Sequence, residues 1–129
     1  MKQNQERYSN GHILLFLVAL SFALYWPGLK TFFSLDDLQF LSRAAGLDQA
    51  ADGFRRVIST RWFFAAGWTL FGTRAWAYHL VVLILHAANA CILYLLARRL
   101  NLKQTAALSA SMLFAAAHVA FLPLHWISG

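Results

Sequence analysis

The stretch of sequence that decides the fold is 75–97, AWAYHLVVLILHAANACILYLLA. It runs for 23 residues without a charged side chain and is followed at once by Arg98 and Arg99. A helix of this length is about 35 Å long at ~1.5 Å per residue. Because the hydrocarbon core of a bilayer is about 30 Å thick, the stretch predicts a transmembrane helix.

Two further apolar runs flank this stretch and predict spans over about 12–29 and 104–126. The first contains ILLFLVALSFALYW at 13–26. A cleavable signal peptide is its alternative, because Ser21 and Ala23 have the spacing of a cleavage site. The run continues to Trp26, which favours an uncleaved helix. In the last span, small residues recur every four positions and predict close approach of another helix: Ala107, Ser111 and Ala115.

The composition agrees with a chain whose solvent is lipid. Of its 129 residues, 60% are hydrophobic and 12% are charged, against about 25% charged in an average soluble domain. The net charge of +6 comes from basic residues beside the apolar runs. That placement favours membrane topology and anionic lipid as partners over nucleic acid.

The basic residues also predict an orientation. The turn at 98–103 carries three basic residues and no acidic one, which places it and the N-terminus in the cytoplasm. The loop at 30–74 is then external. Aromatic side chains act as anchors at membrane interfaces. Those expected near the outer interface are Tyr25, Trp26, Trp76, Tyr78 and Trp126, and those near the inner one are Tyr8 and Tyr94.

The external loop holds two short amphipathic segments expected at the membrane interface. The first begins at Ser34, which has capping-box spacing to Asp37, and ends at Gly46. The second covers about 52–61. The following segment 62–72, WFFAAGWTLFG, is apolar but too short to span, so it is expected to be interfacial, re-entrant or packed on other helices.

Asp36 and Asp37 are the candidate catalytic residues. An external carboxylate can accept a proton from an acceptor hydroxyl as a general base, and two adjacent carboxylates can hold a divalent cation. The alternative is structural, because an acidic residue in the first turn caps a helix and is favoured by its dipole.

Basic and polar side chains supply candidate binding residues. Guanidinium groups suit a lipid phosphate or ordinary anionic headgroups, and the candidates are Arg55, Arg56 and Arg61, with His125 near the outer surface. Another polar set shares one face of the 75–97 span and indicates either function or hydrogen bonds between helices: His79, His86 and Asn89. The histidines lack acidic partners at ligand spacing, so no metal site is predicted.

Taken in order, SLDDLQFL at 34–41, LFGTRAWAYHLVVLILHAANACILYLLARRL at 70–100 and HWISG at 125–129 resemble the GT-C superfamily of membrane glycosyltransferases. The likeness is to bacterial relatives of the protein O-mannosyltransferases, including the type with tetratricopeptide repeats. It implies a polyprenyl- or dolichyl-phosphate sugar donor and an acidic base in the first external loop, at the position of Asp36 and Asp37. The His-x-Glu pair common in this family is missing, with Ala120 and Leu122 at its positions.

The sequence therefore predicts an all-α membrane protein with about three transmembrane helices and two interfacial helices. Residues 1–129 are expected to form one N-terminal membrane segment of a larger glycosyltransferase in a bacterial inner membrane, inactive by itself. Its expected partners are membrane lipids, the sugar donor and further membrane helices; a divalent cation stays open. A small non-enzymatic three-helix membrane protein is the alternative. A transporter fragment has little support, because the spans contain no acidic residue.

Overall fold

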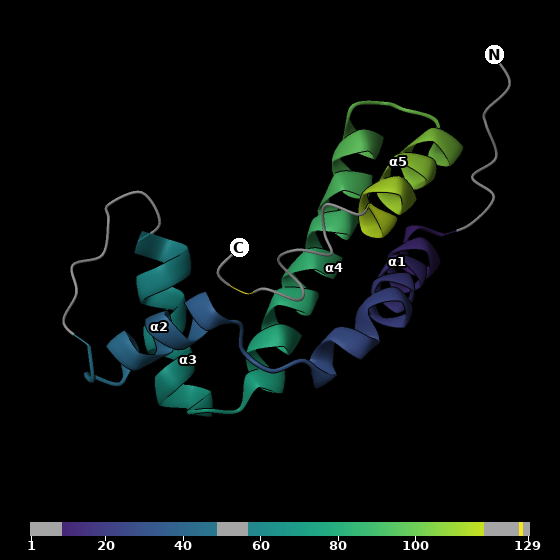
Figure 1. Cartoon of the computed structure of the whole chain (residues 1–129). Helices are drawn as coiled ribbons and strands as arrows, with labels where there is room; N and C mark the ends of the chain where they lie inside the picture. The colour runs from purple at the N-terminus through teal and green to yellow at the C-terminus, as the bar shows by residue number, and fades with distance from the viewer. Residues whose placement is uncertain (1–8, 49–56, 118–126, 128–129) are drawn as a thin grey trace, which may run out of the picture. The chain divides into compact units, whose positions relative to one another are not determined.

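Residues 9–48, 57–117 and 127 are described by a computed structural model, and the regular structure among them is helical (Figure 1). The α-helices of this part of the chain are α1 (Asn10–Tyr25), α2 (Leu35–Ala44), α3 (Phe63–Phe71), α4 (Ala75–Arg99) and α5 (Gln104–Ala116). A 3-10 helix, Trp26–Lys30, continues α1, and a π-helix, Val57–Trp62, leads into α3.

Two helices are long and apolar enough to cross a membrane: Asn10–Lys30, with 21 residues, and Ala75–Arg99, with 25. In the most apolar window of each, only 28% and 33% of the residues are buried within the chain. A core helix of a soluble protein would be mostly covered by the chain's own side chains. These two helices instead present most of their apolar surface outward.

The expected third span is helical over a shorter range than predicted. Helix α5 has 13 residues, and Ala117 after it has extended backbone with ψ 132°. A helix of this length is about 20 Å long, which is shorter than the ~30 Å of hydrocarbon. Residues 118–126 lie outside the described part, so a complete third span stays a prediction.

The chain folds as two compact units, and α4 contributes to both. The span unit comprises Met1–Trp26 and Leu83–Ala120, and the loop unit comprises Pro27–Val82 and Phe121–Gly129. The span unit therefore contains α1, α5 and the larger part of α4. The loop unit contains α2, α3 and the first two turns of α4.

In the span unit, small side chains allow α5 to pack closely on α1. Ala107, Ser111 and Ala115 recur every four residues and all are fully buried. The predicted small-residue face is thus occupied by helices of the same chain, where short side chains permit close van der Waals contact. The buried cluster around Ala107 also includes Ile13, Leu17, Tyr94 and Ala97.

Three of the aromatic residues that were expected to anchor the spans, Tyr25, Tyr78 and Tyr94, are buried within the chain instead. Tyr94 is fully buried and its hydroxyl donates to Asn10 Oδ1 at 2.8 Å. The Tyr25 hydroxyl donates to the Ala117 carbonyl at 3.2 Å. A buried phenol needs such an acceptor, so these residues join helices of the span unit. Trp26 and Trp76, from the same expected set, are exposed, and Tyr8 and Trp126 lie outside the described residues.

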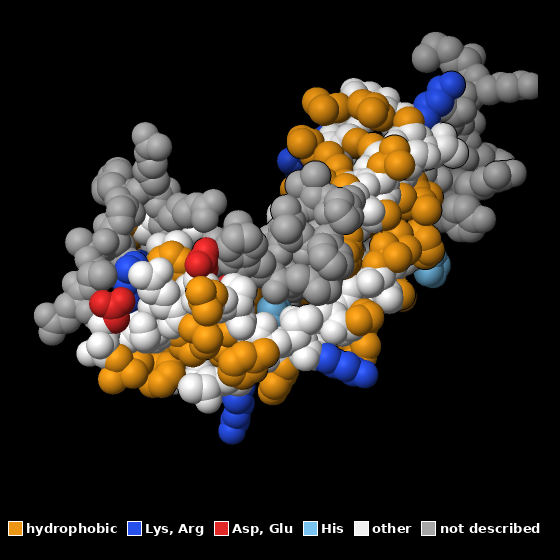
Figure 2. All heavy atoms as spheres, in the orientation of Figure 1, with side chains coloured by type: hydrophobic (Ala, Val, Ile, Leu, Met, Phe, Trp, Pro, Cys, Tyr) orange, Lys and Arg blue, Asp and Glu red, His pale blue; other side chains and the backbone are white. Residues whose placement is uncertain are grey.

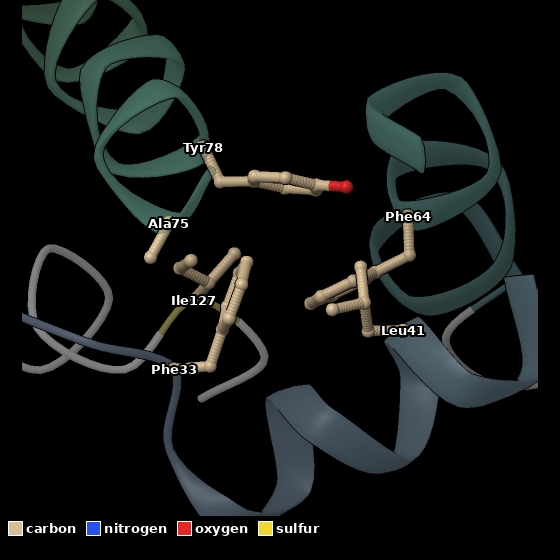
Figure 3. Close-up of a cluster of buried hydrophobic side chains, with 6 residues drawn as sticks. All are labelled: Phe33, Leu41, Phe64, Ala75, Tyr78 and Ile127. Carbon is tan, nitrogen blue, oxygen red and sulfur yellow. The ribbon is translucent and has the colours of Figure 1, made fainter. Parts of the chain in front are cut away.

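The core of the loop unit is built around Tyr78 (Figure 3). This ring is fully buried, and its centroid lies 5.2 Å from that of Phe33 and 5.8 Å from that of Phe64. Its hydroxyl donates to the Gly72 carbonyl at 2.9 Å. The other buried members of the cluster are Leu41, Ala75 and Ile127. Tyr78 therefore fixes the start of α4 against α2 and α3.

Helix α3 receives the Tyr78 ring at Gly67. A Cβ atom added to Gly67 would clash first with Tyr78 Cε1, and it would lie 2.8 Å from Tyr78 Cζ and 3.0 Å from Tyr78 Cδ1. Both distances are shorter than the ~3.5–4.0 Å at which carbon atoms pack. The glycine therefore provides a notch in a helix interior, where alanine has the better intrinsic propensity.

Candidate functional site

The capping box predicted at Ser34 is present and fixes the start of α2. The Ser34 amide donates to Asp37 Oδ2 at 3.0 Å, and the Asp37 amide donates to Ser34 Oγ at 3.5 Å. These bonds satisfy two of the backbone donors that every helix leaves without partners at its N-terminus. Gly46, with φ 77°, follows the last turn as predicted.

The structure separates the two adjacent carboxylates. Asp37 is fully buried, and its Oδ2 also accepts a hydrogen bond from the amide of Ile127 at 3.4 Å. Asp36 occupies the same first turn of α2 but is exposed. Successive side chains on a helix point about 100° apart, so one carboxylate faces the loop-unit core and the other faces outward.

This difference decides which carboxylate can reach a substrate from outside. A general base must come within about 2.6–3.2 Å of the proton donor. Asp37 is enclosed and engaged in the cap, whereas Asp36 is open. Asp37 Oδ2 already accepts hydrogen bonds from the amides of Ser34 and Ile127. Among residues 9–48, 57–117 and 127, no group of three or more His, Cys, Asp or Glu could hold a metal ion.

The basic candidates are only partly described. Arg55, Arg56 and His125 lie outside the described residues, while Arg61 is exposed in the π-helix before α3. Sequence reasoning missed Arg43, whose Nε lies 3.3 Å from Asp48 Oδ2 and whose guanidinium stands 5.5 Å from the centre of the Phe40 ring. A basic residue in the last turn of a helix was its only sequence signal.

The polar residues predicted on one face of α4 belong to different surroundings. His79 is buried in the loop unit, with Nε2 3.1 Å from Thr31 Oγ1. His86 belongs to the span unit, with Nε2 3.1 Å from the Ala115 carbonyl, whereas Asn89 is exposed. His86 thus bonds α4 to α5, as the interhelical alternative predicts. His79 instead bonds to Thr31, which lies in the connection before α2.

No protein-family model, curated protein or solved structure matches this chain. The candidate site is therefore defined by its own side chains. It consists of an exposed carboxylate, Asp36, on a capped helix that begins five residues after the first candidate span. The exposed guanidinium of Arg61 lies in the same loop unit. An exposed carboxylate can accept a proton, and an exposed guanidinium can bind a phosphate.

Proposed function

We propose that this chain is the N-terminal membrane part of a GT-C glycosyltransferase. In this proposal, a sugar passes from a polyprenyl-phosphate donor to an acceptor hydroxyl on the outer face of a bacterial inner membrane. The N-terminus lies in the cytoplasm, and α1 and α4 cross the bilayer with the loop unit outside. The order of sequence features given above supports the family, and the two long apolar helices support membrane residence.

The observation that carries the catalytic part of the proposal is the exposure of Asp36 beside the buried Asp37. Asp37 holds the first turn of α2 through the capping box. Asp36 is therefore presented from a fixed backbone, and a fixed position is what a general base requires. In the proposed reaction, Asp36 removes the acceptor proton while the hydroxyl oxygen attacks the anomeric carbon and the bond to the donor phosphate breaks.

The donor phosphate needs positive charge, because it gains negative charge as the sugar leaves. Arg61 is exposed and can meet it with two parallel hydrogen bonds. Arg55 and Arg56 are assigned the same role from sequence alone. A contact between His125 and the donor is likewise assigned from sequence alone. Arg61→Gln should slow transfer. Arg99→Gln is the matched control, because Arg99 is an exposed arginine at the C-terminal end of α4.

The test is transfer of a radiolabelled sugar from polyprenyl phosphate in membranes that contain the chain with any in-frame continuation. Asp36→Asn should abolish transfer. Asp37→Asn should retain much of it, because an amide oxygen can accept the same backbone hydrogen bonds. Asp48→Asn is the matched control and should leave transfer unchanged. Transfer that survives Asp36→Asn and Asp37→Asn together would refute the proposed base.

The alternative, a small non-enzymatic membrane protein, is favoured by one observation. Helices α1, α4 and α5 share a buried cluster in the span unit, with Leu17 and Ala107 fully enclosed. Such a unit can be stable without further helices. The encoding DNA distinguishes the two functions, since an in-frame continuation with more apolar segments supports the glycosyltransferase and a stop codon after Gly129 supports the small protein.

A further inference from the structure

Helix α3 is apolar on both of its faces. One face carries the buried residues Phe64 and Gly67 and packs in the loop-unit core. On the other face Leu70 is 72% exposed, and Trp62, directly before the helix, is 69% exposed. The small residues between them, Ala65 and Ala66, are exposed as well. Thr69 is the exposed polar residue on this face, and its hydroxyl donates to the Ala66 carbonyl at 2.8 Å, so the helix itself satisfies this donor. A helix that is hydrophobic all round is normally covered on all sides by protein or by lipid.

The charges beside α3 indicate which of these covers the outward face. The helix contains no charged residue, and exposed arginines stand at its two ends, Arg61 and Arg74. The sequence contains no Asp or Glu after Asp52. An apolar strip between guanidinium groups matches acyl chains bounded by phosphate headgroups, and an exposed tryptophan at its edge is typical of the membrane interface.

The connection to α4 places α3 beside a candidate span. Only Gly72, Thr73 and Arg74 separate the two helices. The turn is tight, because Gly72 has φ 59° and the Arg74 amide donates to the Phe71 carbonyl at 3.2 Å. The end of α3 therefore lies within a few residues of the point where α4 would enter the bilayer. In Figure 2, hydrophobic side chains gather on the visible surface of the loop unit as well as on that of the span unit.

We propose that the outward face of α3, formed by Trp62, Ala65, Ala66 and Leu70, lies in the lipid bilayer. Arg74 contacts lipid phosphates at one end of this face, and Arg61, at the other end, meets the phosphate of the polyprenyl-phosphate donor. The occupant of this surface is lipid, rather than a partner protein or another segment of the chain. The inference rests on the membrane residence proposed above, and it adds that the loop unit is itself immersed along one helix.

The experiment measures which quencher reaches a fluorescent label on α3. In a Cys91→Ala background, a single cysteine is introduced by Leu70→Cys, labelled with an environment-sensitive dye and reconstituted into vesicles. Ala66→Cys is a second variant on the same face, chosen because a small exposed residue leaves the packing intact. Two variants serve as references. Leu85→Cys replaces a residue of α4 that is 54% exposed, and Ser9→Cys replaces an exposed residue before α1.

Spin-labelled lipids should quench the labels at positions 70 and 66 by about the same fraction as the Leu85→Cys label, and iodide should quench only the label at position 9. Quenching by iodide at both α3 positions would mean that this face is in water and would overturn the inference. Protection from both quenchers would mean that protein covers the face and would also overturn it. If the Leu85→Cys label also escapes lipid quenching, membrane residence itself is refuted. Quenching at α4 without quenching at α3 refutes only the immersion of α3.

Discussion

The notch at Gly67 leads to a strong prediction about stability. Gly67→Ala would add one methyl group to the buried face of α3, where three ring carbons of Tyr78 stand too close to the added Cβ: Cε1, which is nearest, Cζ at 2.8 Å and Cδ1 at 3.0 Å. The ring has little freedom to withdraw. It is fully buried, it lies against Phe33 and Phe64, and its hydroxyl is bonded to the Gly72 carbonyl. The substitution therefore forces either the helix or the ring out of position.

Two unfavourable contributions and one favourable contribution set the expected change in the free energy of unfolding. Overpacking a well-filled core costs about 1–3 kcal/mol, and losing the hydrogen bond from the Tyr78 hydroxyl costs about 1 kcal/mol more. Replacing glycine in a helix interior gives back about 1 kcal/mol of helix propensity. Gly67→Ala should therefore lower the free energy of unfolding by about 1–3 kcal/mol, although an alanine here improves the intrinsic helix preference.

Thermal unfolding of the purified protein in detergent, followed by near-ultraviolet circular dichroism, measures this effect. Gly11→Ala is the matched control, because the nearest atom to its added Cβ is Ser9 Oγ at 3.7 Å; it should be neutral or slightly stabilising. In a double-mutant cycle, Tyr78→Leu should relieve much of the cost of Gly67→Ala. If Gly67→Ala unfolds at the wild-type temperature, the proposed packing of Tyr78 on α3 is wrong.

Two further predictions use neighbouring residues as controls. Asp37→Leu should destabilise the loop unit by about 1–3 kcal/mol, because it removes the cap of α2 and leaves the buried Ile127 amide without this acceptor. Asp36→Leu should have little effect on stability, and equal losses from both variants in a thermal melt would contradict the assigned burial. Ala107→Leu should lower the free energy of unfolding by about 1–3 kcal/mol, because it overpacks α5 against α1. Ala106→Leu, on the exposed side of α5, should leave it unchanged. If both variants keep the same fraction of folded protein after heating, as measured by size-exclusion chromatography, the close packing is refuted.

The parts of the fold that the sequence predicted depend on local signals. The length of the apolar run at 75–97 was sufficient to predict α4. The spacing of Ser34 and Asp37 was sufficient to predict the capping box. The end of α5 at Ala116 has no such signal, since the sequence passes through Ala115, Ala116 and Ala117 without a breaker. Alanine favours helix, so the extended backbone at Ala117 comes from the surroundings rather than from local preference.

The candidate site was predictable only in part, because the burial of its residues depends on contacts that are distant in the sequence. The pair Asp36–Asp37 could be found from its place after the first apolar run. Which of the two is buried depends on Ile127, whose amide donates to Asp37 from 90 residues away in the chain. Helical periodicity reports the faces of one element and says nothing of a partner so distant in sequence. The roles of Tyr25, Tyr78 and Tyr94 were misjudged likewise, because an interfacial and a buried tyrosine have the same local pattern.

The bond between Ile127 and Asp37 also bears on the order in which the protein is completed during synthesis. At about 5–20 residues per second, the 90 residues between these positions take roughly 5–20 s to be made. The ribosome therefore delivers α2 and its acidic pair well before the amide that encloses Asp37. The loop unit begins at Pro27 but is completed only by residues 121–129, so Asp37 lacks this donor while the rest of α4 and α5 are made. A nascent chain stalled before residue 127 should consequently be cut by added protease within the loop unit. A chain extended by a linker after Gly129, so that Ile127 has left the ribosome, should be protected.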